Sequence, residues 1–315
     1  MKIVLAAGTG QIGALLARSF LARGDDVVVL TRGTRGLARV VTWDATTLGD
    51  WTAELDGADV VVNLAGRSVN CRYTEANLAE MLRSRVDSTR VIGEAIARAA
   101  HPPRVWLQMS TATIYAHRLD AANDEATGII GGSELGVPDY WRRSVEIGTA
   151  WERSLAEAVT PRTRRVALRT TMVMSPDRGG IFDVLLGLVR RGLGGPIGGG
   201  AQYVSWIHDA DFVRAIDFLI ARDDLDGAVN LAAPEPLPQA DFMRALREAA
   251  AVRVGLPATT WMAEIGAWAL RTDTELLLKS RRVVPGRLRD AGFEFTQPSW
   301  PAAARDLVSR WRASS

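Results

Sequence analysis

Residues 2–32 read KIVLAAGTGQIGALLARSFLARGDDVVVLTR, and this stretch decides the fold. A short apolar run at 3–6 leads directly into the glycine-rich turn Gly8-Thr9-Gly10-Gln11-Ile12-Gly13. A helical pattern follows and ends at Gly24, and a second apolar run occupies 27–30. This order of strand, glycine-rich turn, helix and strand is the context in which a dinucleotide-binding turn occurs. Glycines let the backbone approach a pyrophosphate, whose charge is then held by free N–H groups at the helix start.

One position next to the turn departs from the usual pattern. Ala7 stands where dinucleotide-binding turns of this spacing usually carry their first glycine. Alanine is the smallest replacement, so we expect the turn to persist with Ala7 at negative φ. The alternative is a glycine turn in an unrelated α/β sheet. We prefer dinucleotide binding because both strands and the helix are in the required order.

The end of the second apolar run indicates which dinucleotide fits. NAD-binding sheets usually place an Asp or Glu about twenty residues past the turn. Thr31 and Arg32 occupy that place here, and Arg35 follows shortly. A carboxylate repels a 2′-phosphate, whereas a guanidinium binds it with paired, charge-assisted hydrogen bonds. The sequence therefore predicts NADP(H) as the cofactor, and ordinary solvated loop charges at Arg32 and Arg35 are the alternative.

Composition limits the other classes of function. The 315 residues include 38 basic and 36 acidic side chains, with no basic block interleaved with aromatics, so we expect no nucleic-acid partner. Cys71 is the single cysteine, so we expect no internal disulfide and no metal site. The chain starts directly in an apolar strand, and no apolar stretch is long enough to span a bilayer. We expect a cytoplasmic monomer or homodimer that binds a small-molecule substrate and no membrane.

Apolar runs and helical patterns alternate along the first half of the chain. The runs lack polar alternation, which indicates a parallel sheet covered by helices on both faces. Ligands in such sheets bind beyond the carboxyl ends of the strands. The expected strands are 39–42, 59–66, 104–109 and 165–171, and the expected helices are 75–100 and one carrying Ile147, Trp151 and Leu155. The strand ends expected to face one crevice are Ala7-Gly8, Thr31-Arg32, Asp44, Ala65-Gly66, Ser110-Thr111 and Thr170-Thr171.

The second half of the chain has a different character. Residues 187–200 are rich in glycine, which suits a mobile loop beside a site. A helix is expected at 209–220 and a late strand of the sheet at 228–231. From Pro234 onward, proline-punctuated helices carry large apolar residues that favour the core of a small cap lobe over a ligand box. These residues are Trp261, Trp268, Leu276, Leu277, Leu278, Leu307 and Trp311.

We therefore predict an α/β fold with two parts. A Rossmann-type, doubly wound parallel sheet occupies 1–175, and 205–232 returns to it. A smaller, mostly helical C-terminal substrate lobe is made of 176–204 and 233–315.

Several stretches spread along nearly the whole chain carry a family resemblance. They are Gly8 to Gly13, Asn63-Leu64-Ala65-Gly66, Ser84-Arg85-Val86, Ala150-Trp151-Glu152, Leu193-Gly194-Gly195-Pro196, Ser205-Trp206-Ile207-His208, Ala232-Ala233-Pro234-Glu235-Pro236 and Ala291-Gly292-Phe293. On these residues the chain resembles the extended short-chain dehydrogenase/reductases. It most closely resembles an atypical, epimerase-like branch with its own C-terminal helical domain.

The resemblance implies how the cofactor is held. The turn from Gly8 to Gly13 is expected to bind the pyrophosphate, Arg32 the 2′-phosphate and Asp44 the adenine amino group. Leu64-Ala65-Gly66 is expected to line the ribose and adenine side. A turn-capping role for Asp44 is the alternative. The predicted cofactor-binding residues are Gly8, Thr9, Gly10, Gln11, Ile12, Gly13, Thr31, Arg32, Arg35, Asp44, Leu64, Ala65, Gly66, Met109, Ser110, Thr171, Met172 and Val173.

The resemblance also implies where the reacting groups lie. Residues 109–115 match the family segment whose Ser or Thr, four residues before a Tyr, hydrogen-bonds the reacting carbonyl. That match implies this role for Thr111, and satisfying a strand end is the alternative. Residues 169–176 match the segment that passes the nicotinamide, so Met172 and Val173 are expected to touch its ring and carboxamide.

The catalytic helix departs from the family pattern. Short-chain dehydrogenases normally use a Tyr four residues before a Lys that lowers the pKa of the phenol. Ser144 and Gly148 hold those places here, and Tyr140 is followed four residues later by Ser144. A phenol with a pKa near 10 and no cationic neighbour is a poor proton shuttle at neutral pH. The proton therefore needs another source.

Four proton sources remain open: Tyr115, Tyr140, His208 and water. We predict Thr111, Tyr115 and His208 as catalytic residues. A structural histidine that ties the cap to the sheet is the alternative for His208. Tyr140 and Trp206 are expected to contact the substrate.

Three functions fit these residues. The first is an NADPH-dependent oxidoreductase that reduces a small carbonyl or imine substrate between the sheet and the cap lobe. The second is a sugar-nucleotide epimerase or dehydratase, and the missing Tyr-Lys pair counts against it because that chemistry needs a strong base. The third is a non-catalytic NADP(H)-binding sensor or scaffold. Fold and family alone do not decide between them.

Overall fold

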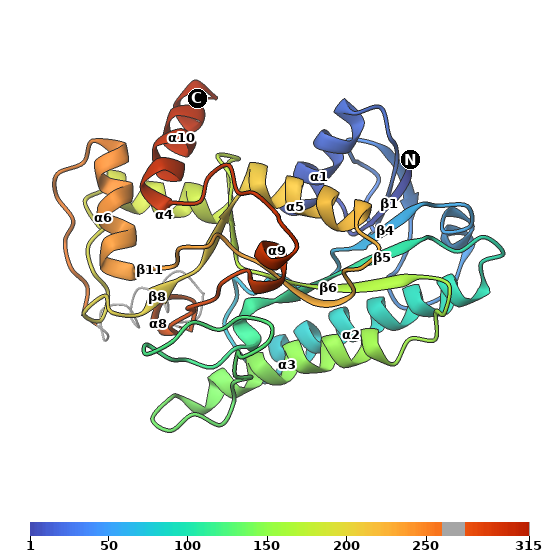
Figure 1. The fold of residues 1–315 in the computed structure, drawn as a ribbon, viewed down its shortest axis with the longest axis horizontal. Coiled ribbons are helices and arrows are strands. Elements are labelled where there is room, and N and C mark those ends of the chain that lie inside the picture. Colours follow the sequence, from blue (N-terminus) through green and yellow to red (C-terminus); the bar gives the residue numbers. More distant parts are fainter. Residues whose placement is uncertain (260–274, 315) are drawn as a thin grey trace.

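The computed structural model describes residues 1–259 and 275–314. Its centre is a seven-stranded parallel sheet with the strand order β10-β6-β5-β4-β1-β2-β3 (Figure 1). The strands are β1 (Lys2–Ala6), β2 (Asp26–Thr31), β3 (Arg39–Thr42), β4 (Val60–Asn63), β5 (Val105–Thr111), β6 (Arg164–Thr170) and β10 (Gly227–Leu231). The chain moves outward from β1 first in one direction and then in the other. This order confirms the predicted Rossmann-type, doubly wound α/β fold.

Helices cover both faces of the sheet (Figure 1). α1 (Gln11–Ala22) and α5 (Asp209–Ala221) lie on one face, and α2 (Glu75–Arg98) and α3 (Asp139–Ala156) lie on the other. With both faces covered, side chains of either parity along a strand are buried, which explains the continuous apolar runs in the sequence.

Successive residues of β1 enter two different apolar cores. Ile3 and Leu5 pack with α1 and α5, whereas Val4 and Ala6 pack with α2. All four side chains are fully buried. The first strand is thus held from both sides, and the turn that follows it starts from a rigid base.

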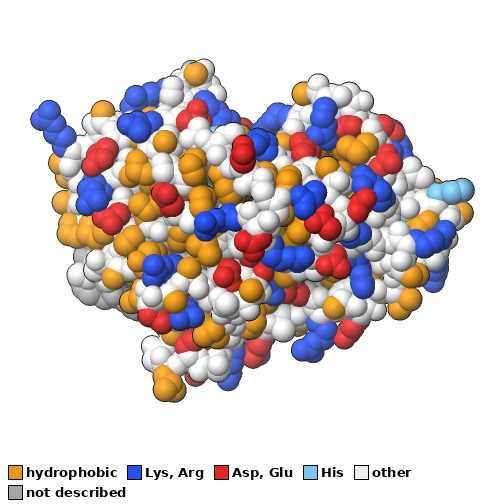
Figure 2. Space-filling view, in the orientation of Figure 1, with side chains coloured by type: hydrophobic (Ala, Val, Ile, Leu, Met, Phe, Trp, Pro, Cys, Tyr) orange, Lys and Arg blue, Asp and Glu red, His pale blue; other side chains and the backbone are white. Residues whose placement is uncertain are grey.

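The C-terminal lobe has a core of its own. α4 (Ile181–Arg190), α6 (Gln239–Ala250) and α10 (Trp300–Ala313) pack around it. The rings of Phe242 and Trp300 stack there, with centroids 4.0 Å apart and planes 9° from parallel. On the face in Figure 2, charged side chains of both signs are interspersed, and hydrophobic side chains gather over this lobe.

The remaining elements are short. Two pairs of short strands are β7 (Met172–Met174) with β9 (Trp206–His208), and β8 (Tyr203–Val204) with β11 (Leu237–Pro238). The other short elements are η1 (Asp50–Glu54), η2 (Ala112–Ile114), α8 (Glu275–Leu278) and α9 (Gly286–Asp290). β7 directly follows β6, so its partner β9 lies close to the carboxyl end of the sheet.

Some sequence expectations are confirmed and others corrected. Residues 228–231 return to the sheet beside β6, as expected. The glycine-rich loop predicted at 187–200 is wrong at its start, because Gly187 lies inside α4. Phe182, Leu186 and Val189 give that helix an apolar face that outweighs one glycine. The strand expected at 59–66 ends at Asn63.

The tryptophans and leucines predicted for the cap core have different outcomes. Leu307 and Trp311 are buried in the core of the C-terminal lobe, as predicted. Trp261 and Trp268 lie outside the described residues, as do the side chains of Leu276 and Leu277. In the part of the chain that the structure describes, no helix is long and apolar enough to cross a membrane.

Candidate active site

The glycine-rich turn between β1 and α1 is shaped by two glycines. A Cβ on Gly13 would overlap the backbone of Gly8, and a Cβ on Gly8 would lie 2.8 Å from the Cβ of Leu5. Gly10 differs, because a Cβ there would meet nothing within 4 Å. Gly8 and Gly13 are therefore required by the protein's own packing. Gly10 instead borders open space at the start of α1, where a ligand can approach the backbone.

Ala7 corrects the expectation of negative φ. Its φ is +58°, in the left-handed region. Its N–H donates to the carbonyl of Leu30 at 2.8 Å, which keeps Ala7 paired to β2 while the chain turns toward α1. An L-residue in this conformation costs roughly 1–2 kcal/mol, so the packing around the turn imposes it.

The start of α1 has hydrogen-bond donors without acceptors. Its N-cap, Gly10, makes no side-chain capping bond. The side-chain Nε2 of Gln11 is buried and has no hydrogen-bond partner within 1–259 and 275–314. Unpaired buried donors at a helix N-terminus fit an anionic group such as a pyrophosphate.

The loop after β7 crosses the start of α1. A Cβ on Gly180 would overlap the side-chain amide of Gln11, so the loop lies directly against it. Arg18 of α1 forms an ion pair with Asp177 of the same loop. A dinucleotide on the turn would therefore be covered from this side by residues 175–180.

The residues predicted to bind the 2′-phosphate follow β2. Thr31 is buried, and its Oγ1 accepts the N–H of Gly33 at 3.1 Å. Arg32 and Arg35 are exposed, and no carboxylate among the described residues forms an ion pair with either of them. Two guanidinium groups are thus available beside the strand end, and no carboxylate occupies the position typical of NAD-binding sheets.

Asp44 caps a turn, which is the role given as the alternative to adenine binding. Its carboxylate accepts the N–H groups of Thr46 and Thr47 at 2.8 Å each and the Thr47 hydroxyl at 2.5 Å. The Thr47 hydroxyl and these backbone donors hold the pKa of Asp44 well below its usual value. These bonds explain Asp44 without a ligand, and its contact with adenine stays a prediction.

The strand ends predicted to face one crevice lie along one edge of the sheet. Ala6 is in register with Leu30 and with Asn63, and Thr111 is in register with Thr170. The side-chain oxygen of Asn63 accepts the N–H of Ala65 at 3.0 Å and shapes the turn through Leu64-Ala65-Gly66. The sheet therefore presents these ends side by side.

β5 leads into η2 and α3, whereas β6 leads through β7 into the C-terminal lobe. Ser110 donates to Glu152 at 2.6 Å, and Thr171 donates to the carbonyl of Leu231 at 2.8 Å. Met172 and Val173 form β7 beside β9. Met109 and Met172 are partly exposed, whereas Val173 is buried. The nicotinamide contacts predicted here remain predictions.

Thr111 lies partly exposed at the end of β5. Its Oγ1 accepts the N–H of Thr113 at 3.1 Å and so caps η2, which is the strand-end role given as its alternative. This bond uses the oxygen as an acceptor. The hydroxyl proton can still be donated to a substrate, so the two roles are compatible.

Tyr115 is built into the interior. Its side chain is 2% exposed, its hydroxyl donates to Asn230 at 3.0 Å, and it accepts from Arg169 at 2.9 Å. Burial raises the pKa of Tyr115 despite the nearby guanidinium. This geometry weighs against Tyr115 as the proton donor, because both hydrogen bonds hold the phenol inside the protein.

His208 ties the two parts of the fold together. It is the N-cap of α5, where its Nδ1 accepts the N–H of Ala210 at 3.1 Å. Its Nε2 lies 2.9 Å from Asp306 of α10. Its Nδ1 also lies 3.1 Å from Asp209, so partners on α5 and α10 hold both ring nitrogens. This geometry favours the structural alternative for His208.

The two predicted substrate contacts occupy different environments. Tyr140 is partly exposed near the start of α3, with its ring edge-on to Trp141 at 6.5 Å. Trp206 is 0% exposed and packs against Trp300, with ring centroids 5.0 Å apart. The structure therefore leaves Tyr140 accessible to a ligand and places Trp206 in the core of the C-terminal lobe.

A buried polar cluster next to Thr111 was missed by sequence reasoning. Ser144 donates to Glu275 at 2.5 Å, and Lys279 lies 3.3 Å from the other oxygen of Glu275. Lys279 also donates to the carbonyl of Thr113 at 2.9 Å. Glu275 and Lys279 are 0% and 2% exposed. We call Ser144, Glu275 and Lys279 the acid–base cluster.

The acid–base cluster adjoins the end of β5. Gly148, one helical turn after Ser144, would place a Cβ 3.2 Å from the methyl group of Thr111. Burial lowers the pKa of Lys279, although the carboxylate of Glu275 acts in the opposite sense. The only sequence signal for this pair was an acid and a base four residues apart, which is commonplace on helices.

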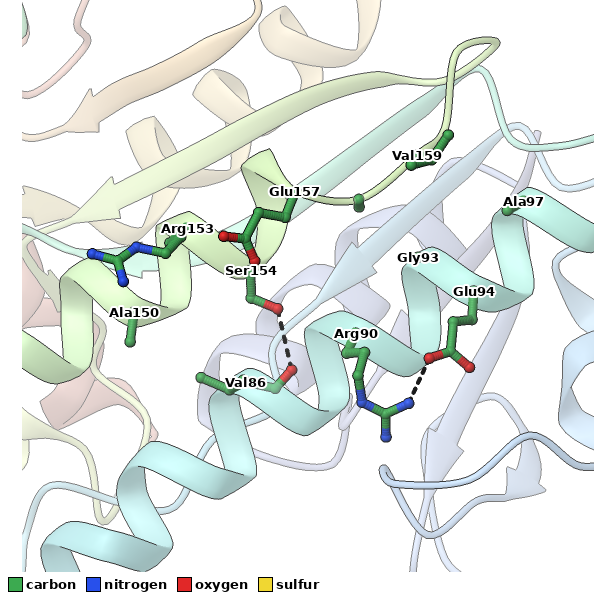
Figure 3. Close-up of a pocket in the computed structure, with 11 residues that line it drawn as sticks. Val86, Arg90, Gly93, Glu94, Ala97, Ala150, Arg153, Ser154, Glu157 and Val159 are labelled. Carbon is green, nitrogen blue, oxygen red and sulfur yellow. Dashed lines mark hydrogen bonds and ion pairs between the residues drawn. The ribbon is translucent and has the colours of Figure 1, made fainter.

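Two grooves on the described surface lie away from the predicted cofactor-binding residues. One, of about 500 Å³, lies between α2 and α3 and is lined mainly by apolar atoms (Figure 3). Ser154 donates there to the carbonyl of Val86 at 3.4 Å. The other, of about 1050 Å³, runs beside β6 and β10. None of the predicted cofactor-binding residues lines either groove.

Together, the doubly wound sheet, the glycine turn and the unpaired donors at α1 define a dinucleotide-binding α/β protein. Comparison with known proteins adds the family. Residues 3–133 match the NAD dependent epimerase/dehydratase family, and residues 260–307 match a domain of unknown function, DUF1731.

Relatives match almost the whole chain. The epimerase family protein SDR39U1 of Bos taurus is 32% identical over 98% of this chain and 100% of its own length. The protein of the same name from Mus musculus is 31% identical over the same shares. The chain therefore belongs to the NAD-dependent epimerase/dehydratase family, in the epimerase family that includes SDR39U1. This confirms the resemblance stated from its motifs.

Solved structures support the same fold. The crystal structure of human epimerase family protein SDR39U1 with NADPH is 28% identical and has a TM-score of 0.85. The match covers 98% of this chain and 99% of the human chain. A UDP-N-acetylglucosamine 4-epimerase from Bacillus cereus has a TM-score of 0.74 at 15% identity, with 99% of each chain covered. The second likeness shows the fold alone.

Proposed function

We propose that this protein is an NADP(H)-dependent oxidoreductase that reduces a small carbonyl or imine substrate in the crevice. The observation that carries the cofactor choice is the pair Arg32 and Arg35, exposed after β2 without carboxylate partners among the described residues. The unpaired Nε2 of Gln11 supports a pyrophosphate at α1. The NADPH in the crystal structure of the human relative agrees with this choice.

An Arg32→Ala variant is expected to lose roughly tenfold or more in affinity for NADPH, because a charge-assisted contact to the 2′-phosphate is removed. Affinity for NADH, which lacks that phosphate, should change little. Calorimetry with both cofactors on the wild type and the variant tests this. Arg83→Ala, at an exposed position of α2, is the matched control. Equal wild-type affinities for NADPH and NADH would contradict the proposal.

The chain supplies groups for orientation and for proton transfer. When bound, NADPH supplies the hydride. Thr111 donates its hydroxyl hydrogen bond to the carbonyl oxygen or imine nitrogen and orients the substrate. We assign the proton to the ammonium of Lys279, because it lies at the carbonyl of Thr113, two residues from Thr111, and burial lowers its pKa below that of an ordinary lysine. The substrate carbon gains the hydride, its heteroatom gains the proton, and Lys279 regains a proton from solvent.

Lys279→Met is expected to lower turnover about 100- to 10,000-fold, the usual effect of losing one positioned acid, and to leave NADPH affinity unchanged. Thr111→Ala should behave similarly. NADPH oxidation across a carbonyl and imine panel gives the rates, and cofactor fluorescence gives the affinity. Tyr115→Phe and His208→Asn test the competing assignment. If either of those variants loses turnover while Lys279→Met keeps it, the donor is the residue predicted from sequence.

The pH profile adds a second readout for the acid–base cluster. The ionisable groups around Lys279 are Glu275, Glu134, Arg281 and His117. Because burial lowers the pKa of Lys279, the ammonium is lost as pH rises through a value below 10.5. A proton donor must be protonated, so turnover should fall on the alkaline side. That alkaline limb should be absent in Lys279→Met.

Two other functions are distinguished by the same panel. A sugar-nucleotide epimerase or dehydratase would show NADP(H)-dependent turnover of a sugar nucleotide with no net NADPH oxidation. A sensor or scaffold would bind NADPH tightly and oxidise none of the panel. The reductase is preferred because the described residues offer a buried ammonium as an acid, and the strong phenolate base that sugar oxidation needs is absent at 144.

A further inference from the structure

Arg85 is a buried cation with an unusual set of neighbours. It lies on α2, is 9% exposed, and donates to the carbonyl of Met81 at 2.9 Å. Its guanidinium carbon lies 4.9 Å from the ring centroid of Trp151 on α3. A Cβ on Gly66 would approach that carbon to 3.2 Å. The guanidinium is thus packed between α3 and the loop that follows β4.

No carboxylate neutralises Arg85 among the described residues. The charged or ionisable groups that act on it are Tyr73 and Cys71, and burial lowers its pKa to about 10. Arg169 shows the contrast. Its side chain is 12% exposed, but Glu152 binds it at 2.7 and 2.8 Å and its pKa is raised. A buried guanidinium without an anion is unfavourable, because desolvation is not offset by a charge of opposite sign.

The position of Arg85 relates this charge to the crevice. Gly66 follows the carboxyl end of β4, where ligands of a doubly wound sheet bind. With no side chain at Gly66, the loop leaves the guanidinium close to that edge. Trp151 provides an apolar wall on the opposite side, which strengthens electrostatic contacts by excluding water.

We propose that Arg85 binds an anionic group, a phosphate or a carboxylate, of the ligand in this crevice. The proposal deepens the proposed function and rests on it only for the statement that the crevice binds a ligand. The cofactor phosphates already have candidate partners at the start of α1 and at Arg32. Arg85 contacts α3, the helix that also carries Ser144 of the acid–base cluster. This placement favours an acidic group of the substrate over a phosphate of the cofactor.

The test compares three variants of the full chain. Arg85→Met removes the charge and keeps most of the volume, and Arg85→Lys keeps a charge without the bidentate geometry. Arg83→Met is the matched control, since Arg83 lies on the same helix with a side chain 62% exposed. Calorimetric titrations use pyrophosphate and oxalate on both the NADPH-saturated and the free protein, and NADPH on the free protein. Thermal melting of the free protein is measured alongside.

We expect Arg85→Met to weaken pyrophosphate or oxalate binding about 10- to 100-fold, with Arg85→Lys intermediate and Arg83→Met unchanged. The melting temperature of the free Arg85→Met protein should stay the same or rise, because an unneutralised buried charge is removed. A loss confined to NADPH affinity would also support the anion site and assign it to the cofactor.

Wild-type affinity of Arg85→Met for all three ligands would overturn the proposal, and a lower melting temperature in that variant would then leave Arg85 a structural residue. These outcomes are separate from the reductase activity. Pyrophosphate and oxalate titrations on the free protein report on Arg85 even if NADPH does not bind or no substrate is turned over.

Discussion

A Gly10→Val variant is expected to fold with an unchanged melting temperature and to lose about 100-fold or more in affinity for NADPH. A Cβ at Gly10 meets no protein atom within 4 Å, so the free chain accommodates a side chain there. The same space lies at the start of α1, where Gly10 makes no side-chain cap and a pyrophosphate approaches the backbone. The added branched side chain would occupy the position of the phosphates.

Gly13→Ala is the counterpart that separates a ligand effect from a folding effect. Its Cβ would overlap the backbone of Gly8, which cannot move without displacing the turn. This variant should therefore melt at a clearly lower temperature. Melting curves and NADPH fluorescence titrations on both variants make the comparison. Wild-type NADPH affinity in folded Gly10→Val would show that the phosphates bind elsewhere.

Glu152→Ala is expected to destabilise the fold by about 3 kcal/mol or more and to lower the melting temperature by at least about 5 °C. Glu152 accepts two hydrogen bonds from Arg169 and one from Ser110, and the two charged side chains are 17% and 12% exposed. Removing the carboxylate leaves the guanidinium of Arg169 without a charged partner in a mostly buried position. Breaking a pair in this way is far more costly than breaking a solvated pair.

Arg169 also donates to Tyr115, which in turn donates to Asn230 of β10. The loss of Glu152 should therefore loosen the contact between β5, β6 and β10. Glu146→Ala is the matched control on α3, where exposed Glu146 pairs with Arg142 and Arg143 near the surface. Thermal or urea unfolding that shows the same change for both variants would refute a structural role for the buried pair.

The parts of the fold that depend on neighbours in sequence were predictable. The unit from β1 to β2 was located because strand, glycine turn and helix have local signals of period and composition. The lack of a carboxylate after β2 was visible in the same way. The φ of Ala7 was predicted with the wrong sign, because packing between β1, β2 and α1 decides it and the residue's own preference does not.

The candidate site depends much more on residues distant in sequence. Tyr115 and Asn230 are 115 residues apart, Ser144 and Glu275 are 131 apart, and Lys279 and Thr113 are 166 apart. No pattern of spacing relates such pairs. The sequence named Tyr115 and His208 as proton donors because they lie in stretches that match the family, whereas only the fold shows which partners hold them.

The sequence by itself determined the class of fold and the place of the dinucleotide turn, and it predicted a 2′-phosphate on the cofactor, since each depends on adjacent residues and backbone freedom. The tertiary structure alone decided which polar groups are buried together. It paired Glu152 with Arg169, brought Lys279 beside Thr113 and left Arg85 without a carboxylate among the described residues. The physical reason is that desolvation and charge pairing depend on distance in space, and the packing of the sheet, α3 and the C-terminal lobe sets those distances.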